Sequence, residues 1–390
     1  MPWKETCAME ERYEFVKAFE AGEEGMAALC RELGVSRVTG YKWIQRYVEE
    51  GIEGLANRSR APHHQPRAVA QDIMERVIAE RRVHSHWGPR KIKSWLEQRE
   101  PGRPWPSAST IGEILAAQGL IVPRKRRRHV VPYTRPFAQC TQPNNVWCAD
   151  FKGWFRTGDG QRCEPLTISD ACTRYLLRCQ ALLHTAYQDV QPLFEATFRE
   201  YGLPGAIRTD NGRPFCAPSR VGLSRLSVWW IKLGIVPERI RPGHPEENGR
   251  HERLHRTLAQ HAITPPKATW RAQQRAFDAF RHEYNHERPH EALGQTQPAA
   301  HYQPSPRPHP SRLPVVTYPD HMIVRRVQRH GEFYWKGEPV SLSEVLEAEP
   351  IGLDQTYIDT YYRIYFMDVL IGYFDARTLT VQPPLAKLKR

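Results

Sequence analysis

The sequence predicts a multidomain protein with a helical N-terminal part, a central α/β layer domain and a small C-terminal β domain. Apolar residues follow helical spacing up to about residue 120, and alternating, strand-like patterns begin after residue 140. Further strand-like segments, separated by glycine-containing turns, follow residue 315. Since a chain of 390 residues is also too long for one ordinary core, we expect several domains in series.

The chain is strongly basic, with 56 lysines and arginines against 43 aspartates and glutamates. This excess indicates an anionic partner and favours nucleic acid over a membrane surface. No apolar run approaches the roughly 20 residues of a membrane span, and the first residues lack the apolar centre of a signal peptide. Eight cysteines occur without a Cys-x-x-Cys pair, which favours reduced thiols over a zinc site. We therefore expect a soluble intracellular protein.

The first domain, residues 1–56, is predicted to contain a helix-turn-helix. In the segment MAALCRELGVSRVTGYKWIQRY, Gly34 can supply the turn and Ser36 can cap the next helix. One side of that helix is polar and could enter a major groove, although a solvated basic face is the alternative. The candidate DNA-contacting residues on this side are Arg37, Thr39, Lys42 and Arg46.

A second helical unit, residues 69–122, lies between two basic linkers. The first linker, residues 57–68, carries Arg58 and Arg60 in a proline-containing arm that could lie in a minor groove. The unit itself has three amphipathic segments and is predicted to be a divergent helix-turn-helix, with Ser107 or Ser109 as a helix cap. The second linker, residues 123–139, can serve both as a solvated linker and as a phosphate contact. Its candidate contacts are Arg124, Lys125, Arg126, Arg127 and Arg128.

Two acids in the α/β domain, residues 140–303, stand where an unpaired charge would be costly. Asp150 lies within the apolar strand pattern NNVWCADFKGWF, and Asp210 ends a short strand before an Asn-Gly turn. Each could simply pair with an arginine or open a turn. Together with a third carboxylate from a helix that crosses the strand ends, they would instead form an oxygen-rich pocket for a divalent cation.

The segment RPGHPEENGRHERLHRTL, residues 241–258, can supply that third carboxylate. A helix starting near Pro245 would place Glu246 and Glu247 at its positive end, which accounts for both acids. We expect Glu252 to lie more than one turn inside this helix, on a polar face. The alternative is a surface ion pair with Arg256. Residues that could hold phosphates nearby, or equally form a solvated basic face, are His244, Asn248, Arg250, Arg253 and Arg256.

The C-terminal part begins with a proline-rich stretch, residues 304–314, which is predicted to be a stiff linker. Residues 315–390 show about five strand-like segments. We expect a small β-barrel of SH3-like size, whose role the sequence does not indicate.

Four segments resemble, in order, the signatures of the integrase catalytic core of bacterial insertion-sequence transposases and retroviral integrases: WCADFKGWF, IRTDNGRPF, RPGHPEENGRHERLHRTL and YNHERPHEALGQTQPAAHY. The resemblance covers about residues 140–305 and implies a ribonuclease H-like fold. It also implies an Asp-Asp-Glu triad that holds two Mg²⁺ or Mn²⁺ ions. Carried over motif by motif, the catalytic and metal-binding residues are Asp150, Asp210 and Glu252, whereas Asp170 is interpreted as a turn residue. The interval between the second and third acid is longer than is usual in the family, and we expect the extra residues in CAPSRVGLSRL.

The resemblance further implies a DDE transposase that binds terminal inverted repeats through residues 1 to about 138. Such an enzyme cleaves the element ends by metal-dependent hydrolysis and joins the 3′-hydroxyl to target DNA. Two alternatives are a catalytically silent DNA-binding regulator derived from a transposase and a ribonuclease H-like nuclease without strand transfer. The implied partners are double-stranded DNA and further copies of the chain, at least a dimer, in the bacterial cytoplasm near the nucleoid.

Overall fold

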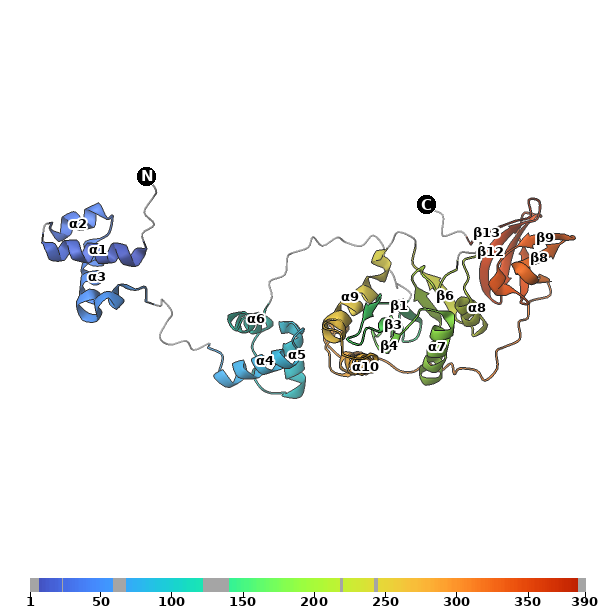
Figure 1. The fold of residues 1–390 in the computed structure, drawn as a ribbon, viewed down its shortest axis with the longest axis horizontal. Helices are drawn as coiled ribbons and strands as arrows, with labels where there is room; N and C mark the ends of the chain where they lie inside the picture. Colours follow the sequence, from blue (N-terminus) through green and yellow to red (C-terminus); the bar gives the residue numbers. More distant parts are fainter. Residues whose placement is uncertain are drawn as a thin grey trace. The chain divides into compact units, whose positions relative to one another are not determined.

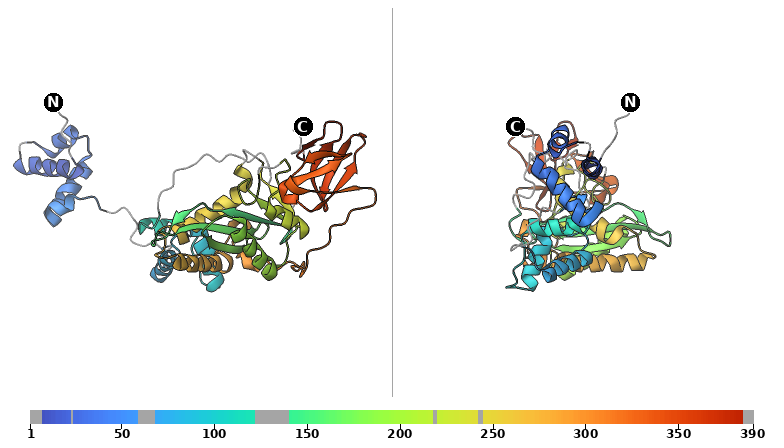
Figure 2. Two further views of the ribbon diagram at one scale, coloured as in Figure 1. Left: turned by 45° about the vertical axis from the view of Figure 1, so that its right-hand side comes forward. Right: turned by 90° about the vertical axis from the view of Figure 1, so that its left-hand side faces the viewer.

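The computed structural model describes residues 7–22, 24–58, 68–121, 140–217, 220–241 and 245–384. The chain divides into two units, Met1–Val69 and Ala70–Arg390, which are considered separately (Figures 1 and 2). The predicted DNA contacts Arg60, Arg124, Lys125, Arg126, Arg127, Arg128 and His244 lie outside the described residues. Among the described residues, no helix combines the length and apolar character needed to cross a bilayer.

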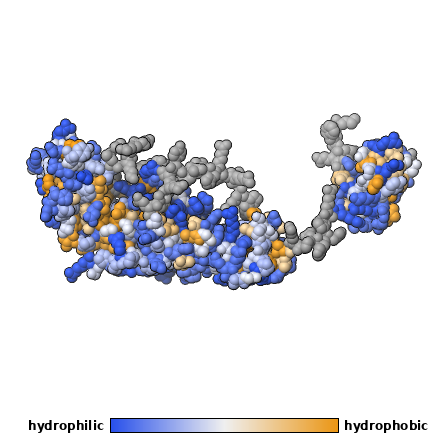
Figure 3. Space-filling view, turned by 180° about the vertical axis from the view of Figure 1, so that it is seen from behind, coloured by the Kyte–Doolittle hydropathy of each residue, from blue (hydrophilic) through white to orange (hydrophobic). Residues whose placement is uncertain are grey.

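The first unit is a small helical domain, as the sequence predicts. Its helices are α1 (Ala8–Ala21), α2 (Met26–Glu32) and α3 (Arg37–Glu50), followed by the 3-10 helix η1 (Gly51–Leu55). Gly34 adopts a φ of +65° between α2 and α3, and the Ser36 hydroxyl accepts a hydrogen bond from the Thr39 amide at 3.1 Å. A Cβ on Gly40 would lie 2.8 Å from Cys30 Sγ, so glycine lets α3 approach α2 closely. Hydrophilic residues predominate on the visible face of this unit (Figure 3).

The second unit begins with three helices around their own core. They are α4 (Gln71–Val83), α5 (Pro89–Arg99) and α6 (Ala108–Ala117), and they bury Val77, Trp87, Ile92, Leu96 and Ile111. Pro89 occupies the first turn of α5, where its missing amide hydrogen costs nothing. The Ser107 hydroxyl caps α6 by accepting from the Thr110 amide at 3.2 Å. The stretch predicted to be a second helical unit thus contains three helices around one core.

A mixed sheet forms the centre of the second unit. Its path is β2-β3-β1-β5-β6, and β4 also pairs with β3. The strand bounds are β1 (Val146–Phe151), β2 (Phe155–Arg156), β3 (Arg162–Asp170), β4 (Leu176–Leu182), β5 (Ala206–Thr209) and β6 (Val236–Arg239). Strand β1 runs antiparallel to β3 and parallel to β5. The carboxyl ends of β1 and β5 therefore meet at one edge of the sheet.

Helices cover both faces of this sheet (Figure 1). On one face, α7 (Tyr187–Tyr201) and α8 (Arg225–Lys232) bury Phe194, Phe198 and Trp230 against Trp147 and Ile207. On the other face, α9 (Gly249–Leu258), the π-helix η3 (Ala259–Ile263) and α10 (Trp270–His286) pack Leu254, Leu258 and Phe277 against Leu176 and Cys179. Two separate hydrophobic layers thus confirm the predicted α/β core.

The proline-rich stretch 304–314 begins as a segment bound to the core rather than as a free spacer. The Ser305 amide donates to the Tyr201 carbonyl at 2.8 Å, and the Leu203 amide donates to the Arg307 carbonyl at 2.7 Å. Gly202 has a φ of +75°, and a Cβ there would lie 2.6 Å from the Ser305 carbonyl oxygen. The segment therefore lies across the C-terminal end of α7.

The predicted closed β-barrel is wrong for the C-terminal region. An open antiparallel sheet is present in the order β13-β12-β11-β10-β7, together with the hairpin β8-β9. Within the described residues, the edge strands β7 and β13 do not pair with each other. The strands are β7 (Ile323–Arg326), β8 (Glu332–Trp335), β9 (Glu338–Ser341), β10 (Pro350–Gln355), β11 (Tyr361–Phe366), β12 (Val369–Asp375) and β13 (Thr380–Gln382).

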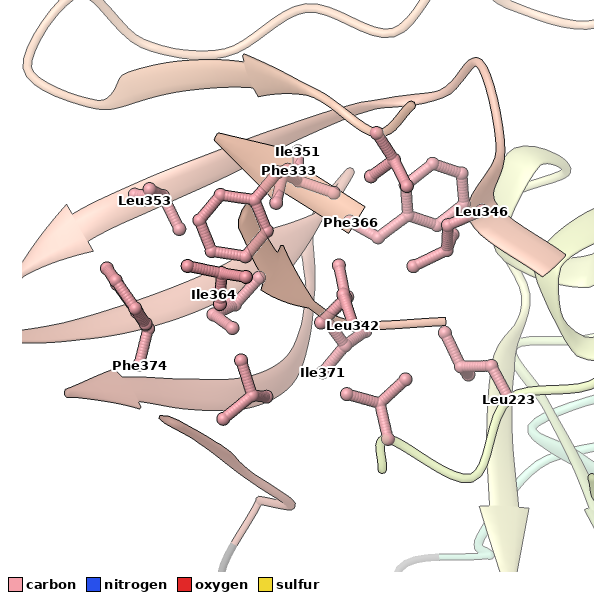
Figure 4. Close-up of a cluster of buried hydrophobic side chains, with 14 of the residues drawn as sticks. Leu223, Phe333, Leu342, Leu346, Ile351, Leu353, Ile364, Phe366, Ile371 and Phe374 are labelled. Carbon is pink, nitrogen blue, oxygen red and sulfur yellow. The ribbon is translucent and has the colours of Figure 1, made fainter. Parts of the chain in front are cut away.

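The open sheet shares its hydrophobic core with the α/β domain. Phe333, Phe366 and Phe374 are buried in one cluster with Leu223, from the loop before α8, and Ile231 of α8 (Figure 4). The Lys232 ammonium and the Glu349 carboxylate form an ion pair at 2.6 Å beside it. Apolar surface is thus covered by α8 and the β8-β9 hairpin, which explains why the sheet need not close on itself.

Candidate active site

Asp150 and Asp210 lie beside each other at the carboxyl edge of the sheet. In the parallel pair, Cys148 of β1 is in register with Arg208 of β5. Two residues further along, Asp150 sits near the end of β1 and Asp210 directly follows β5. The predicted placement of both acids on neighbouring strand ends is therefore confirmed.

The Asp150 carboxylate is half-buried and held by a neighbour from the other side of the site. Asn248 Nδ2 donates a hydrogen bond to Asp150 Oδ2 at 2.7 Å. The pKa of Asp150 is raised to about 6, mainly by burial and further by the negative charges of Asp210 and Glu252, while the Asn248 hydrogen bond opposes the rise. Asp150 is thus influenced by the charges of both other predicted acids.

Asp210 also performs the structural role that was the alternative interpretation. Its Oδ1 accepts from the Gly212 amide at 3.1 Å, and a Cβ on Gly212 would lie 3.0 Å from Oδ2. The next residue, Asn211, donates from Nδ2 to the Ile240 carbonyl at 3.0 Å. The tight turn therefore fixes this carboxylate at the strand end, a position from which it can also bind a ligand.

Glu252 differs from the expectation in its position within the helix. A 3-10 turn, η2 (Pro245–Asn248), comes first, and α9 itself begins at Gly249. Glu252 consequently lies in the first turn of α9, exposed to solvent, where the helix dipole favours an acid. The prediction that it lies more than one turn inside is wrong, because the 3-10 turn takes up the residues expected to begin the helix. Among the described residues, no ion pair joins Glu252 to Arg256.

Glu247 has a structural partner. Its carboxylate accepts from the Arg241 amide at 2.9 Å and from Arg241 Nε at 2.7 Å. Burial would raise the pKa of Glu247, but these bonds hold it below its usual value. This acid therefore closes the loop that leads into α9.

A buried polar cluster that the sequence analysis missed lies behind Asp150. Thr167 of β3, in register with Asp150, is fully buried, and its hydroxyl lies 2.7 Å from His251 Nε2 and 2.8 Å from His255 Nε2. The same hydroxyl donates to the Asp150 carbonyl at 3.2 Å. Burial lowers the pKa of His251 to about 4 and that of His255 to about 2, so both rings are neutral. The cluster fixes α9 against the strand that carries the first acid.

His255 also faces the carboxylate itself, since its Nδ1 lies 4.0 Å from Asp150 Oδ2. Two histidines four residues apart in an amphipathic helix were the available sequence signal. Their burial depends on Thr167, which is distant in the sequence and became visible only in the fold.

The other predicted site residues are dispersed. Asp170 is a turn residue as expected, because its carboxylate accepts from the Asn144 and Thr173 amides at 2.8 and 2.7 Å. Arg250 Nη1 donates to the Ala171 carbonyl at 2.8 Å, and Arg253 is exposed. In the first unit, the solvent-facing or half-buried candidates are Arg37, Thr39, Lys42 and Arg46, with Arg58 exposed and ion-paired to Glu50.

The three acids have the chemistry of a Mg²⁺ or Mn²⁺ site, because hard divalent cations take carboxylate oxygens. Asp150 and Asp210 meet at one edge, and Glu252 enters from α9. Among the described residues, however, no three histidine, cysteine or acidic side chains are gathered closely enough to hold a metal ion. The donors therefore fit a divalent cation in type and location, and Glu252 would have to turn inward to complete the set.

Family models match most of the chain in four segments. An integrase core domain model matches residues 140–245, and a second integrase core domain model matches residues 233–298. A helix-turn-helix domain matches residues 11–63, and a homeodomain-like domain matches residues 39–115. The matched core spans all three candidate acids.

Curated relatives come from bacterial mobile elements. The uncharacterized 31.7 kDa protein of insertion element IS407 from Burkholderia multivorans is 26% identical over 240 residues, covering 61% of this chain and 82% of the relative. The 39.2 kDa protein of insertion element IS476 from Xanthomonas euvesicatoria is 26% identical over 237 residues, covering 60% and 65%. The transposase for transposon Tn552 from Staphylococcus aureus is 21% identical over 275 residues, covering 64% and 55%.

Solved structures align only loosely. The simian T-cell lymphotropic virus intasome, in complex with a PP2A regulatory subunit, gives a TM-score of 0.36 at 15% identity, covering 79% of this chain and 99% of that chain. The HTLV-2 integrase catalytic core domain in complex with magnesium gives 0.32 at 15% identity, covering 41% and 98%. At these scores the alignments add nothing to the sheet order and the site geometry.

Proposed function

We propose that this chain, which belongs to the bacterial insertion-sequence transposases with an integrase core and an N-terminal helix-turn-helix, is an active DNA transposase. The observation that carries the proposal is that Asp150 and Asp210 lie at the ends of adjacent parallel strands. Glu252 is near enough for its charge to raise the pKa of Asp150. A regulator that only binds DNA would not need two carboxylates at adjacent strand ends with a third on the neighbouring helix.

In the proposed reaction, water first attacks a phosphodiester at the element end and releases a 3′-hydroxyl. That hydroxyl then attacks a phosphodiester of target DNA. In each step one phosphorus–oxygen bond forms and one breaks, so no energy source and no covalent protein intermediate are required. Both steps are in-line phosphoryl transfers.

Different residues of the chain would have different roles in this reaction. Asp150, Asp210 and Glu252 would hold two Mg²⁺ or Mn²⁺ ions, which when bound supply Lewis acidity toward the phosphodiester oxygens. Asn248 orients the Asp150 carboxylate through its 2.7 Å hydrogen bond. Thr167, buried with its two histidine partners, keeps β3 and α9 aligned.

The helical units are proposed to bind the terminal inverted repeats. Helix α3 exposes Arg37 and Lys42, and Ser36 caps its first turn. The remaining phosphate contacts are proposed for the basic residues Arg58, Arg60, Arg124, Lys125, Arg126, Arg127, Arg128, His244, Arg250, Arg253 and Arg256. Two element ends must be brought together for joining, so we propose a homo-oligomer of at least two chains on double-stranded DNA.

The test compares three variants in a strand-transfer assay with labelled element ends and Mg²⁺. Asp150→Asn, Asp210→Asn and Glu252→Gln are each expected to abolish joining and leave DNA binding intact, because each removes a carboxylate charge but keeps the side-chain size. Glu247→Gln is the matched control and should retain joining, because Glu247 is engaged by Arg241. Full activity in Glu252→Gln would remove the third residue from the site.

A further inference from the structure

A cavity of about 450 Å³ lies beside α9, away from the residues that face Asp150. Asn248, just before α9, and His255 of α9 lie next to Asp150, whereas the cavity is lined by other residues of α9. Four separate elements bring basic side chains to it: α5, the turn after β3, α9 and the segment after α10. These side chains are Lys91, Arg174, Arg250, Arg253 and Arg288.

Basic side chains outnumber acids in the lining of this cavity. Among the described residues that line it, the one carboxylate is Glu291, and this pairs with Arg90 at 2.8 Å. Lys91 Nζ donates to the Pro289 carbonyl, which is a neutral acceptor. This hydrogen bond therefore leaves the charge of Lys91 unchanged.

Two polar atoms at the cavity are buried without a partner among the described residues. They are Arg288 Nη1 and His290 Nε2. A buried donor left unpaired costs about 1–3 kcal/mol, and more when the group is charged. Of the two, Arg288 Nη1 is a donor, and because Arg288 lines the cavity, an anion inside it could accept from this atom.

Arg174 reaches the cavity from an unusual backbone conformation. Its φ is +66°, in the left-handed region that a residue with a long side chain rarely adopts. The Arg174 amide donates to the Asp170 carbonyl at 3.0 Å, which closes the turn between β3 and β4. The turn thus positions an arginine where a glycine or asparagine would be less strained.

The pKa shifts agree with this geometry. The pKa of Lys91 is lowered to about 7, mainly by burial and further by the neighbouring Arg288, while Glu291 opposes the fall. Burial also lowers the pKa values of Arg174, Arg250 and Arg288. Such shifts are expected for cations that are partly withdrawn from solvent.

We propose that this cavity is a binding site for one phosphate oxyanion, held by Arg288, Lys91 and Arg174. Several guanidinium donors suit the multiple acceptor oxygens of a phosphate better than they suit a single carboxylate. The phosphate can belong to a DNA backbone or be free in solution, and the source from DNA rests on the proposed function. Bound there, it would join α5 of the second helical unit to α9 and α10 of the core.

The first experiment measures the thermal stability of the full chain in inorganic phosphate and in chloride at equal ionic strength. Phosphate is expected to raise the melting temperature by about 2 °C or more, because a ligand bound only to the folded state stabilises it. Arg288→Gln should lose this increment while melting at or above the wild-type temperature in chloride, since it removes a half-buried guanidinium whose Nη1 has no partner among the described residues. Lys91→Met serves as the second variant if Arg288→Gln does not fold.

The matched control is Arg275→Gln. Arg275 is an exposed arginine of α10, the helix that precedes Arg288, and this variant should keep the full phosphate increment. The proposal is overturned if phosphate stabilises the wild type no more than chloride does. It is also overturned if Arg288→Gln and Lys91→Met both keep the wild-type increment.

The second experiment identifies the source of the phosphate. Affinity for an unrelated DNA duplex is measured against salt concentration for wild type and Arg288→Gln. A DNA phosphate predicts that the salt slope becomes shallower by about 0.9 in the variant, whereas a free oxyanion predicts an unchanged slope. Neither measurement uses element ends, metal or catalysis, so failure of the transposase proposal would leave both outcomes interpretable.

Discussion

The two sides of helix α9 carry opposite charges in excess. On one side, the negative charges of Asp210 and Glu252 help to raise the pKa of Asp150, and on the other, Lys91 and Arg288 are half-buried among further basic side chains. The acids accept hydrogen bonds from Asn248 and the Gly212 amide, whereas Arg288 Nη1 has no partner among the described residues. One helix therefore separates a place suited to cations from a place suited to phosphate.

The largest expected effect concerns the buried cluster on the acid side. Thr167→Val keeps the shape of the side chain but leaves His251 and His255 without their shared partner. We expect the free energy of unfolding to fall by about 2–4 kcal/mol, measured by urea denaturation. Thr167→Ser retains the hydroxyl and should lose much less. If the Thr167→Val variant is as stable as the wild type, the cluster does not hold α9 to the sheet.

The next effect tests whether Asn248 positions the first acid. Asn248→Ala removes the 2.7 Å hydrogen bond to Asp150, and we expect strand transfer to fall about 10–100-fold, as when a residue supporting a metal ligand is lost. DNA affinity and the urea midpoint should stay within error. Equal losses in DNA binding and joining would instead assign Asn248 to the DNA.

A pH-dependent effect tests the basic side. The pKa of Lys91 is about 7 in the folded state and 10.5 as its ordinary value, so the unfolded chain binds more protons between these limits. Lys91 therefore makes the free energy of unfolding rise with pH between about 7 and 10.5. Below about pH 7 the charged Lys91 destabilises the folded chain by its full amount. In phosphate-free buffer, Lys91→Met should be more stable than wild type by about 1–2 kcal/mol near pH 6, a gain that shrinks near pH 9. The prediction is contradicted if the urea midpoints of Lys91→Met and wild type differ by the same amount near pH 6 and near pH 9.

The smallest effect separates the glutamates. Glu247→Gln weakens the contacts with Arg241 and should reduce the free energy of unfolding by about 0.5–1 kcal/mol, because the pair is partly exposed. Strand transfer is measured at equal concentrations of folded protein. Its rate should stay within about twofold of the wild-type rate, because the loss of a surface ion pair has only a small effect. A large loss of joining would move Glu247 into the site.

The acid edge was predictable because strand patterns determine it. The apolar pattern around Asp150 and the turn after Asp210 identify two strand ends, and a parallel pair brings them together. The position of Glu252 in its helix was not predictable in the same way. Pro245 is equally favourable in a 3-10 turn and in the first turn of an α-helix, so the local sequence could not locate the start of α9.

Contacts between distant segments account for the other differences. The sequence analysis did not single out His251 and His255, because their burial depends on Thr167 across the sheet. The strand-rich C-terminal region predicted a barrel, because nothing local shows that Leu223 and α8 would cover its core. The cavity beside α9 was missed because Lys91 and Arg288, far apart in sequence, meet only in the fold.

The central claim is that the acid edge joins DNA ends, and sequencing of reaction products tests it most directly. Purified full-length chain is incubated with candidate element ends, a target plasmid and Mg²⁺, and any new junctions are sequenced. The account predicts element 3′ ends joined to target DNA in wild type and none with Asp150→Asn. Cleaved but unjoined ends, or junctions that persist in Asp150→Asn, would contradict it.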